Sequence, residues 1–106
     1  MKVNGALDLS DEAVEAFCRK WKIQEFALFG SVLRDDFGPD SDVDVLVSFQ
    51  PDTEWDLSDV VDMQHELATI FGRKVDLFDR EAVEQSRNPF RRRAILRNTR
   101  VVYARG

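Results

Sequence analysis

The feature that most constrains the fold is the alternation of acids and valines in the run DVDVLV at residues 42–47. In an extended strand successive side chains point to opposite faces, so the three valines share one face and Asp42 and Asp44 share the other. The run therefore predicts a strand from Val43 to Phe49, closed by Pro51, whose valine face lies in a core. The acidic face must meet solvent or a cation, because neighbouring carboxylates repel each other.

Helix and strand signals alternate along the rest of the chain. Ser10 is a typical N-cap residue, and Gly72 suits the position just after a helix. The patterns predict these elements: a helix from 11 to about 21 or 22, a strand from Phe26 to Phe29, a short helix after Gly30 that the Gly38-Pro39 turn ends, a helix from 57 to 71, a strand from Lys74 to Phe78, helices between 81 and 97 that are interrupted at Asn88-Pro89, and an edge strand from Thr99 to Tyr103. Together they predict one α+β domain at residues 1–106, a small mixed β-sheet with helices packed on one side.

Composition excludes several classes of protein and of site. A chain of 106 residues fits one domain, and no apolar run reaches the roughly 20 residues of a membrane span. The single cysteine, Cys18, excludes an internal disulfide, and a single histidine excludes a His-based metal site. We therefore expect a soluble, cytoplasmic protein, with no membrane partner, in which any metal is held by oxygen ligands.

The charge is unevenly distributed along the chain. The net charge is −5, yet seven arginines and no acid lie from Arg87 onward, which leaves eight basic and twenty acidic residues in the first 86. This acidity disfavours direct nucleic-acid binding, which draws its affinity from phosphate neutralisation. On composition alone the basic end is interpreted as a solvated helix face, and a phosphate-bearing ligand or an acidic partner is the alternative.

The residues suited to chemistry lie in one segment and one later strand. Asp42 and Asp44, on one strand face, are spaced to bridge divalent cations, and hard oxygen ligands suit Mg²⁺ or Mn²⁺. Asp76 stands between two apolar residues of another strand, and it joins the same site if the two strands are neighbours. Gly30 and Ser31 stop a buried strand, where backbone N–H groups and a hydroxyl can hold phosphate oxygens.

In this order the residues resemble a known signature. The runs FGSVLR at 29–34 and PDSDVDVLV at 39–47 look like the motif of the DNA polymerase β-like nucleotidyltransferase superfamily. The short chain is similar to the minimal nucleotidyltransferases (MNT) of prokaryotes, over about residues 26–103. The resemblance implies the polymerase β-like fold and a site for two Mg²⁺ ions and ATP. Carried over, it implies two sets of site residues: catalytic and metal-binding Asp42, Asp44 and Asp76, and nucleotide-binding Gly30, Ser31 and Arg34.

One part of the motif departs from the family. Many relatives have glycine after the motif arginine, whereas this chain has Arg34-Asp35-Asp36. Two further acids near a triphosphate site oppose nucleotide binding unless they point outward. Arg34 accordingly has two interpretations, a phosphate contact or an ion pair with Asp35 or Asp36.

The resemblance also implies a partner. Similar minimal nucleotidyltransferases are often antitoxins that transfer AMP to a tyrosine of a HEPN-domain ribonuclease toxin. Two alternatives stay open: an antitoxin that masks its toxin by binding alone, and a nucleotidyltransferase acting on a small molecule such as an antibiotic. The three clustered acids favour the enzyme over masking. The oligomeric state, homo- or hetero-oligomeric, is open as well.

Four other residues are assigned ordinary structural roles. We expect His65 to be solvated on the polar side of its helix and Cys18 to lie in the core. Trp55, just before a helix, is assigned to packing rather than to stacking on a base. Nothing around Tyr103 singles it out for modification.

Overall fold

The computed structural model describes residues 2–4, 7–34, 37–38 and 40–105. Its elements run in this order: β1 (Lys2–Asn4), β2 (Leu7–Asp8), α1 (Asp11–Lys20), β3 (Ile23–Phe29), the 3-10 helix η1 (Gly30–Leu33), β4 (Val43–Phe49), α2 (Leu57–Phe71), β5 (Val75–Asp79), α3 (Arg80–Glu84), α4 (Pro89–Arg97) and β6 (Thr99–Ala104).

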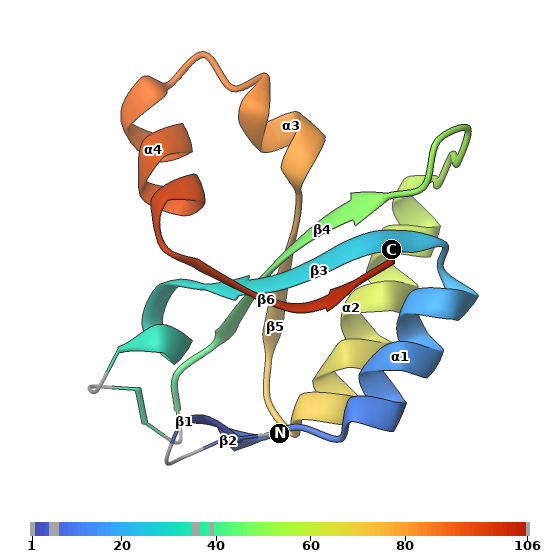
Figure 1. The fold of residues 1–106 in the computed structure, drawn as a ribbon, viewed down its shortest axis with the longest axis vertical. Coiled ribbons are helices and arrows are strands. Elements are labelled where there is room, and N and C mark those ends of the chain that lie inside the picture. The colour runs from blue at the N-terminus through green and yellow to red at the C-terminus, as the bar shows by residue number, and fades with distance from the viewer. Residues whose placement is uncertain (1, 5–6, 35–36, 39, 106) are drawn as a thin grey trace.

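Four strands form the central sheet, in the order β5-β4-β3-β6 (Figure 1). β3 runs antiparallel to both β4 and β6, and β4 runs parallel to β5. The connection between the two parallel strands is α2, as a crossover requires. The predicted mixed sheet is therefore confirmed, and it places β4 and its alternating acids inside the sheet.

Both long helices begin and end at residues suited to those positions. In α1 the Ser10 hydroxyl accepts a hydrogen bond from the Ala13 N–H at 3.2 Å. In α2 the Asp56 carboxylate accepts from the Asp59 N–H at 2.8 Å, and the Asp59 carboxylate accepts from the Asp56 N–H at 3.0 Å. This capping box satisfies two N–H groups that have no partner inside the helix. Gly72 ends α2 in the left-handed conformation, with φ of 71°.

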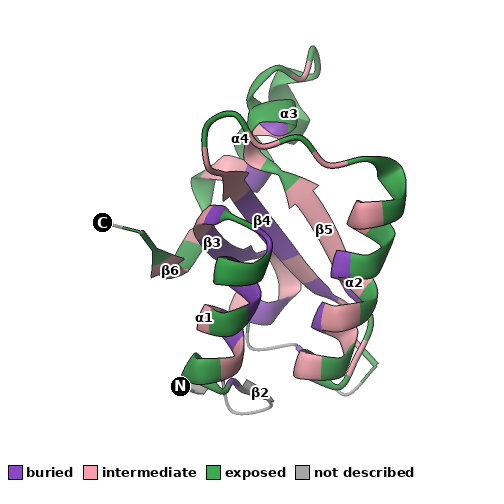
Figure 2. Cartoon of the chain, turned by 90° about the vertical axis from the view of Figure 1, so that its right-hand side faces the viewer, coloured by how far each residue is buried: buried purple, intermediate pink, exposed green. Residues whose placement is uncertain are grey.

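The main core lies between α1, α2 and one face of the sheet (Figure 2). Val43, Val45 and Val47 of β4 are buried there, as the alternation predicts. The two tryptophans of the chain close this core at one end. The rings of Trp21 and Trp55 are 5.1 Å apart between centroids, and the Trp55 Nε1–H donates to the Trp21 carbonyl at 3.2 Å.

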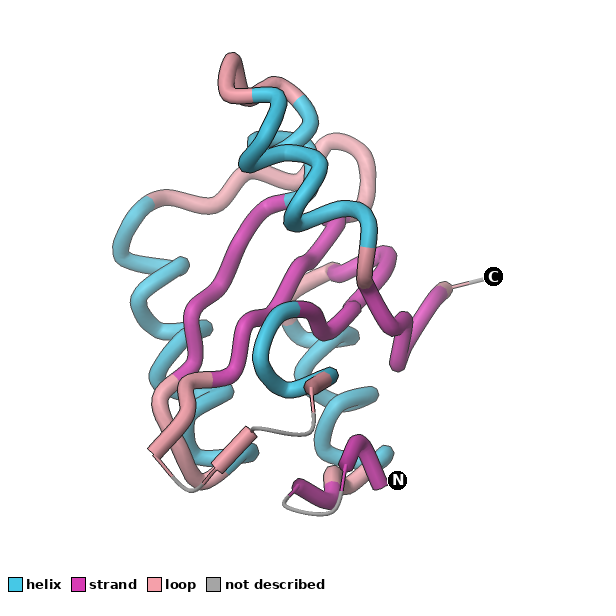
Figure 3. The backbone as a smooth tube through the Cα atoms, turned by 90° about the vertical axis from the view of Figure 1, so that its left-hand side faces the viewer, coloured by secondary structure: helices cyan, strands magenta, loops and turns pink. Residues whose placement is uncertain are grey.

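A second, smaller apolar cluster covers one end of the opposite sheet face. It joins α3 and α4 to the sheet through these residues: Ala27, Phe29, Leu46, Val83 and Ile95. Figure 3 views this side, with the strands in front of the two long helices. The long helices thus pack on one side as predicted, and the two short helices add a partial layer on the other. Asp44 of β4 and Asp76 of β5 lie on this second face, beside the small cluster.

Several element boundaries differ from the sequence prediction, and one strand pair was not predicted. β3 begins at Ile23 rather than Phe26, because its polar residues find partners at the sheet end: Gln24 Nε2 donates to the Arg105 carbonyl at 2.9 Å, and Glu25 pairs with Arg80 at 3.1 Å. β5 is displaced by one residue, and the β1–β2 pair was not predicted at all. Pro39 of the predicted turn lies outside the described residues.

No helix in the described part of the chain has both the length and the apolar character that crossing a bilayer requires.

Candidate active site

The parallel pairing of β4 and β5 brings two carboxylates side by side. Asp44 and Asp76 are register partners in neighbouring strands, and each is partly exposed. Register partners in adjacent strands point to the same face at a backbone spacing of about 4.8 Å. Asp42 directly precedes β4 on the same side of the alternation. The segments around β4 and β5 therefore bring three acids to the sheet face that α1 and α2 leave open. We name these acids, Asp42, Asp44 and Asp76, the carboxylate row.

The electrostatics of Asp44 reflect this gathering of charge. Burial raises the pKa of Asp44 above the ordinary aspartate value, and the negative charges of Asp76 and then Asp42 raise the pKa further. The positive charge of Arg34 acts in the opposite direction. The pKa of Asp44 thus depends on the charges of both other acids and of Arg34. A cation at this position would relieve the repulsion.

Gly30 allows the backbone to approach the Asp44 carboxyl. Gly30 has φ of +76°, a conformation that side-chain-bearing residues rarely adopt. A Cβ built at this position would stand 3.3 Å from the Asp44 Cγ and closer still to its Oδ2. The space against the Asp44 carboxyl is therefore open only because residue 30 is glycine.

Ser31 fastens the η1 turn to the start of β4. Its hydroxyl donates to the Asp42 carbonyl at 3.3 Å. The neighbouring strand residue Phe29 is the register partner of Asp44. These contacts fix the turn against the carboxylate row. The Gly30 and Ser31 predicted for phosphate binding and the three predicted acids therefore lie together.

Lys74 is a site residue that the sequence did not reveal. Its Nζ lies 3.8 Å from Asp42 Oδ2, and its carbonyl accepts from the Val43 N–H at 3.0 Å. The register pairing of Val43 with Val75 brings the preceding residues 42 and 74 together at the sheet end. From sequence, Lys74 was only the first residue of the predicted Asp76 strand, so nothing assigned it to the site before the register was known.

Arg34 lies at the end of η1 and is exposed. Its backbone N–H donates to the Ser31 backbone carbonyl at 3.0 Å, which closes the η1 turn at this residue. Asp35 and Asp36, the acids that depart from the family motif, lie outside the described residues.

The donor set suits magnesium without enclosing it. Within the described ranges, no group of three or more His, Cys, Asp or Glu side chains is arranged to hold a metal ion by itself. Mg²⁺ commonly binds one or two carboxylates, keeps several waters and takes further oxygens from substrate phosphates. Asp42 and Asp44, with Asp76 alongside, supply oxygen donors of this kind around a carboxyl whose repulsion a cation would offset. The residues present therefore fit a divalent cation that is shared with a phosphate ligand.

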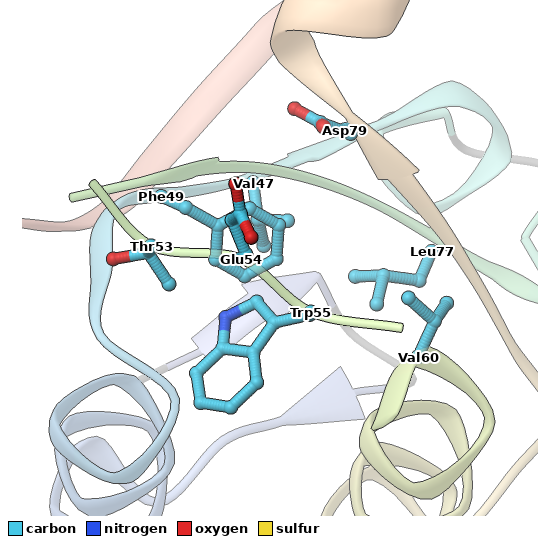
Figure 4. Close-up of a pocket in the computed structure, with 8 residues that line it drawn as sticks. All are labelled: Val47, Phe49, Thr53, Glu54, Trp55, Val60, Leu77 and Asp79. Atoms are coloured by element: carbon cyan, nitrogen blue, oxygen red, sulfur yellow. The ribbon is translucent and has the colours of Figure 1, made fainter. Parts of the chain in front are cut away.

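A cavity of about 490 Å³ lies away from these carboxylates, on the side of α2 (Figure 4). Val47 and Leu77, its floor, point to the sheet face opposite Asp44 and Asp76. Trp55 lines its mouth, with its indole N–H occupied by the Trp21 carbonyl. Trp55 therefore packs in the structure, as the sequence interpretation assigned.

His65 and Cys18 also have the roles expected of them. His65 is exposed on α2, and Cys18 is fully buried. Burial raises the pKa of the Cys18 thiol to about 12, so the reactive thiolate is suppressed at neutral pH.

The chain matches a known protein family over most of its length. The model of the family described as "Nucleotidyltransferase domain" matches residues 10–102. A relative from Methanocaldococcus jannaschii, named "Putative protein adenylyltransferase MJ1379", is 32% identical over 76 residues, which cover 72% of this chain and 73% of the relative.

Two solved structures are similar in fold. One is described as a "putative minimal nucleotidyltransferase"; it has a TM-score of 0.63 and 29% identity, covering 85% of this chain and 86% of that chain. The other is a complex of a tri-AMPylated Shewanella oneidensis HEPN toxin with an MNT antitoxin; it has a TM-score of 0.60 and 18% identity, covering 90% of this chain and 70% of that chain. With the family model spanning β3, β4 and β5, this chain belongs to the nucleotidyltransferase domain family.

Proposed function

We propose that this nucleotidyltransferase transfers AMP from ATP, with Mg²⁺, to a tyrosine hydroxyl of a partner HEPN ribonuclease toxin, and so acts as its antitoxin. The observation that carries the proposal is the row formed by Asp42, Asp44 and Asp76 beside the Gly30–Ser31 turn. Burial and the charges of Asp76 and Asp42 disfavour the charged form of Asp44, which is expected of a site shaped for catalysis rather than for stability.

Each residue has a role in the proposed reaction. The Gly30 and Ser31 backbone, with Arg34 beside it, holds the triphosphate oxygens. Asp42 and Asp44 hold the cations, and Asp76 orients the attacking hydroxyl and accepts its proton. Bound Mg²⁺ would neutralise phosphate charge and lower the pKa of the hydroxyl.

The bonds made and broken balance without any further reactant. The tyrosine oxygen attacks the α-phosphorus of ATP in line with the leaving group. A new P–O bond forms, the bond to the β-phosphate bridging oxygen breaks, and pyrophosphate leaves with that electron pair. The protein supplies position and charge neutralisation rather than covalent chemistry, as is general for phosphoryl transfer.

The proteins that resemble this chain support the choice of nucleotide and acceptor. The M. jannaschii relative is named a protein adenylyltransferase, and the Shewanella complex contains an AMP-modified HEPN toxin bound to an MNT antitoxin. Extended to this chain, these descriptions favour ATP over other nucleotides and a protein over a small molecule as acceptor.

The test incubates the purified protein with Mg²⁺, α-labelled ATP and the HEPN protein encoded beside it. A matched reaction uses the Asp42→Ala/Asp44→Ala variant. We expect label on the HEPN protein, on a tyrosine by mass spectrometry, and none in the variant reaction. Inhibition of the toxin without label transfer would contradict the proposed catalysis and favour an antitoxin that masks its toxin by binding alone. Label on neither protein, with no inhibition, would overturn the proposal in favour of a small-molecule acceptor.

A further inference from the structure

The two faces of α4 differ sharply in character. Ile95 points into the small apolar cluster and is 8% exposed, whereas Phe90 is 81% exposed. Phe90, Arg93, Ala94 and Arg97 recur at helical spacing and are all exposed, so they form one outward face, which we name the arginine face. Asn88 caps the helix by accepting from the Phe90 and Arg91 N–H groups at 3.1 Å.

The charge on the arginine face is not offset locally. Among the described residues, no carboxylate lies within 4.0 Å of a side-chain nitrogen of Arg93 or Arg97. No acid follows Glu84 in the sequence, although the chain as a whole is acidic. An exposed aromatic residue on the same helix face as two arginines that have no ion-pair partner in the described part of the chain is a composition enriched at protein–protein interfaces.

The helix that carries the arginine face lies beside the carboxylate row, which its opposite, inward face approaches. Ile95 of α4 packs in one cluster with Phe29 and Leu46. Phe29 is the register partner of Asp44, and Leu46 follows Asp44 by two residues on the same strand face. Figure 3 shows α4 on this side of the sheet. A macromolecule that places a hydroxyl at Asp44 and Asp76 therefore lies against or beside α4.

We propose that the arginine face docks an acidic segment of the acceptor protein, close in sequence to the modified hydroxyl, and that Phe90 packs against an apolar side chain of that segment. The inference rests on the proposed function, since it names the chemistry of the acceptor for the same site. The segment belongs to a protein rather than to a nucleic acid because the acceptor in the proposed function is itself a protein, and its hydroxyl must reach the carboxylate row beside α4.

The test uses two synthetic peptides that are identical except for the residues around one tyrosine, which are glutamates in one and lysines in the other. Binding is measured by fluorescence anisotropy with Mg²⁺ and a non-hydrolysable ATP analogue. AMP transfer is measured separately with labelled ATP. The variant is Arg93→Gln/Arg97→Gln, and the control is Arg19→Gln/Arg105→Gln, which makes the same change in net charge away from α4.

We expect the wild-type protein and the control variant to prefer the acidic peptide. In Arg93→Gln/Arg97→Gln the Kd for this peptide should rise about tenfold, with an unchanged melting temperature. Phe90→Ala should weaken binding of the same peptide several-fold, again without a change in melting temperature. Raising the salt concentration should weaken binding of the acidic peptide to the wild-type protein.

Three results would overturn the inference: equal affinity for the two peptides, an equal loss in the control variant, or tighter binding of a single-stranded RNA than of the acidic peptide at physiological salt. Its failure is distinguishable from failure of the proposed function. If the peptide binds in a way that depends on Arg93 and Arg97, but no acceptor receives AMP, the docking surface is supported and the proposed AMP transfer is wrong. Transfer with the same KM for both peptides removes the docking surface alone.

Discussion

Gly30 combines two constraints at a single residue, and they can be separated by experiment. Its φ of +76° disfavours any side chain, and its missing Cβ leaves room for the Asp44 carboxyl. Gly72 has nearly the same φ, +71°, but nothing lies within 4 Å of a Cβ placed there. The pair therefore isolates the cost of backbone strain from the cost of crowding the acids.

We predict that Gly30→Ala and Gly72→Ala each lose about 1 kcal/mol of unfolding free energy from strain. Gly30→Ala should lose more in addition, and its AMP-transfer activity should fall about a hundredfold because the carboxyl must shift. Gly72→Ala should keep wild-type activity. Urea denaturation and labelled transfer measure the two quantities. Equal activity in the two variants would remove Gly30 from the site.

Asp44 should make stability depend on pH in an unusual direction. Burial and the neighbouring acids raise the pKa of Asp44 in the folded protein, so the fold holds this proton more tightly than the unfolded chain does. The contribution of this group therefore favours folding at low pH and is lost as pH rises from about 4, the ordinary aspartate value, through the raised pKa.

We predict that Asp44→Asn melts at a higher temperature than the wild type at pH 7 in EDTA, although it is inactive. The difference should shrink as the pH falls toward about 4. Asp62→Asn, an exposed change on α2, serves as the control and should follow the wild type. A variant less stable than wild type at pH 7 would show that Asp44 contributes favourably in its charged form.

For single residues, the sequence identified the candidate acids but not the side chains that lie next to them in space. Alternation alone assigned Asp42 and Asp44 to one face, and an acid between apolar residues singled out Asp76. The proximity of Lys74 to Asp42 depends on the register between β4 and β5. That register pairs Asp44 with Asp76, two residues far apart in the sequence, so no local pattern encodes it.

Among the elements, α2 begins with a reciprocal cap between Asp56 and Asp59, in a turn that is only partly buried. We predict that Asp56→Ala lowers the free energy of unfolding by about 1 kcal/mol, since an N–H at the helix start loses its acceptor. Asp62→Ala, an exposed position within the same helix, should change it by less than about 0.5 kcal/mol. Urea denaturation measures both. Equal effects would mean that the cap adds nothing beyond charge.

Helices that begin or end at a capping residue, a glycine or a proline were predicted well, whereas strands that depend on pairing with distant segments were not. Ser10, Gly72 and Pro89 mark helix ends in the structure as they do in the sequence. The start of β3 was missed because Gln24 and Glu25 break its apolar run, and their partners come from distant segments. The β1 and β2 strands have three and two residues, which is too short for periodicity to give a sign of them.

For the whole molecule, binding of metal and nucleotide should appear as added stability. A ligand at a hundred times its Kd stabilises a folded protein by about 2.7 kcal/mol, or roughly 10 °C in melting temperature for a domain of this size. We predict such a rise with Mg²⁺ and a non-hydrolysable ATP analogue together. EDTA should abolish most of it, as should Asp42→Ala/Asp44→Ala. A rise of the same size in EDTA would exclude a metal shared with the nucleotide.

The contact between Trp21 and Trp55 gives the protein an intrinsic spectroscopic probe. Trp21 follows α1 and Trp55 precedes α2, so the edge-to-face ring pair exists only while these segments are docked. Their coupled signal in near-ultraviolet circular dichroism should vanish when packing loosens, even if far-ultraviolet ellipticity persists. Trp55 also lines the cavity in Figure 4, so its emission should respond to anything that enters there. Folding and occupancy of that cavity can thus be followed without attaching a dye.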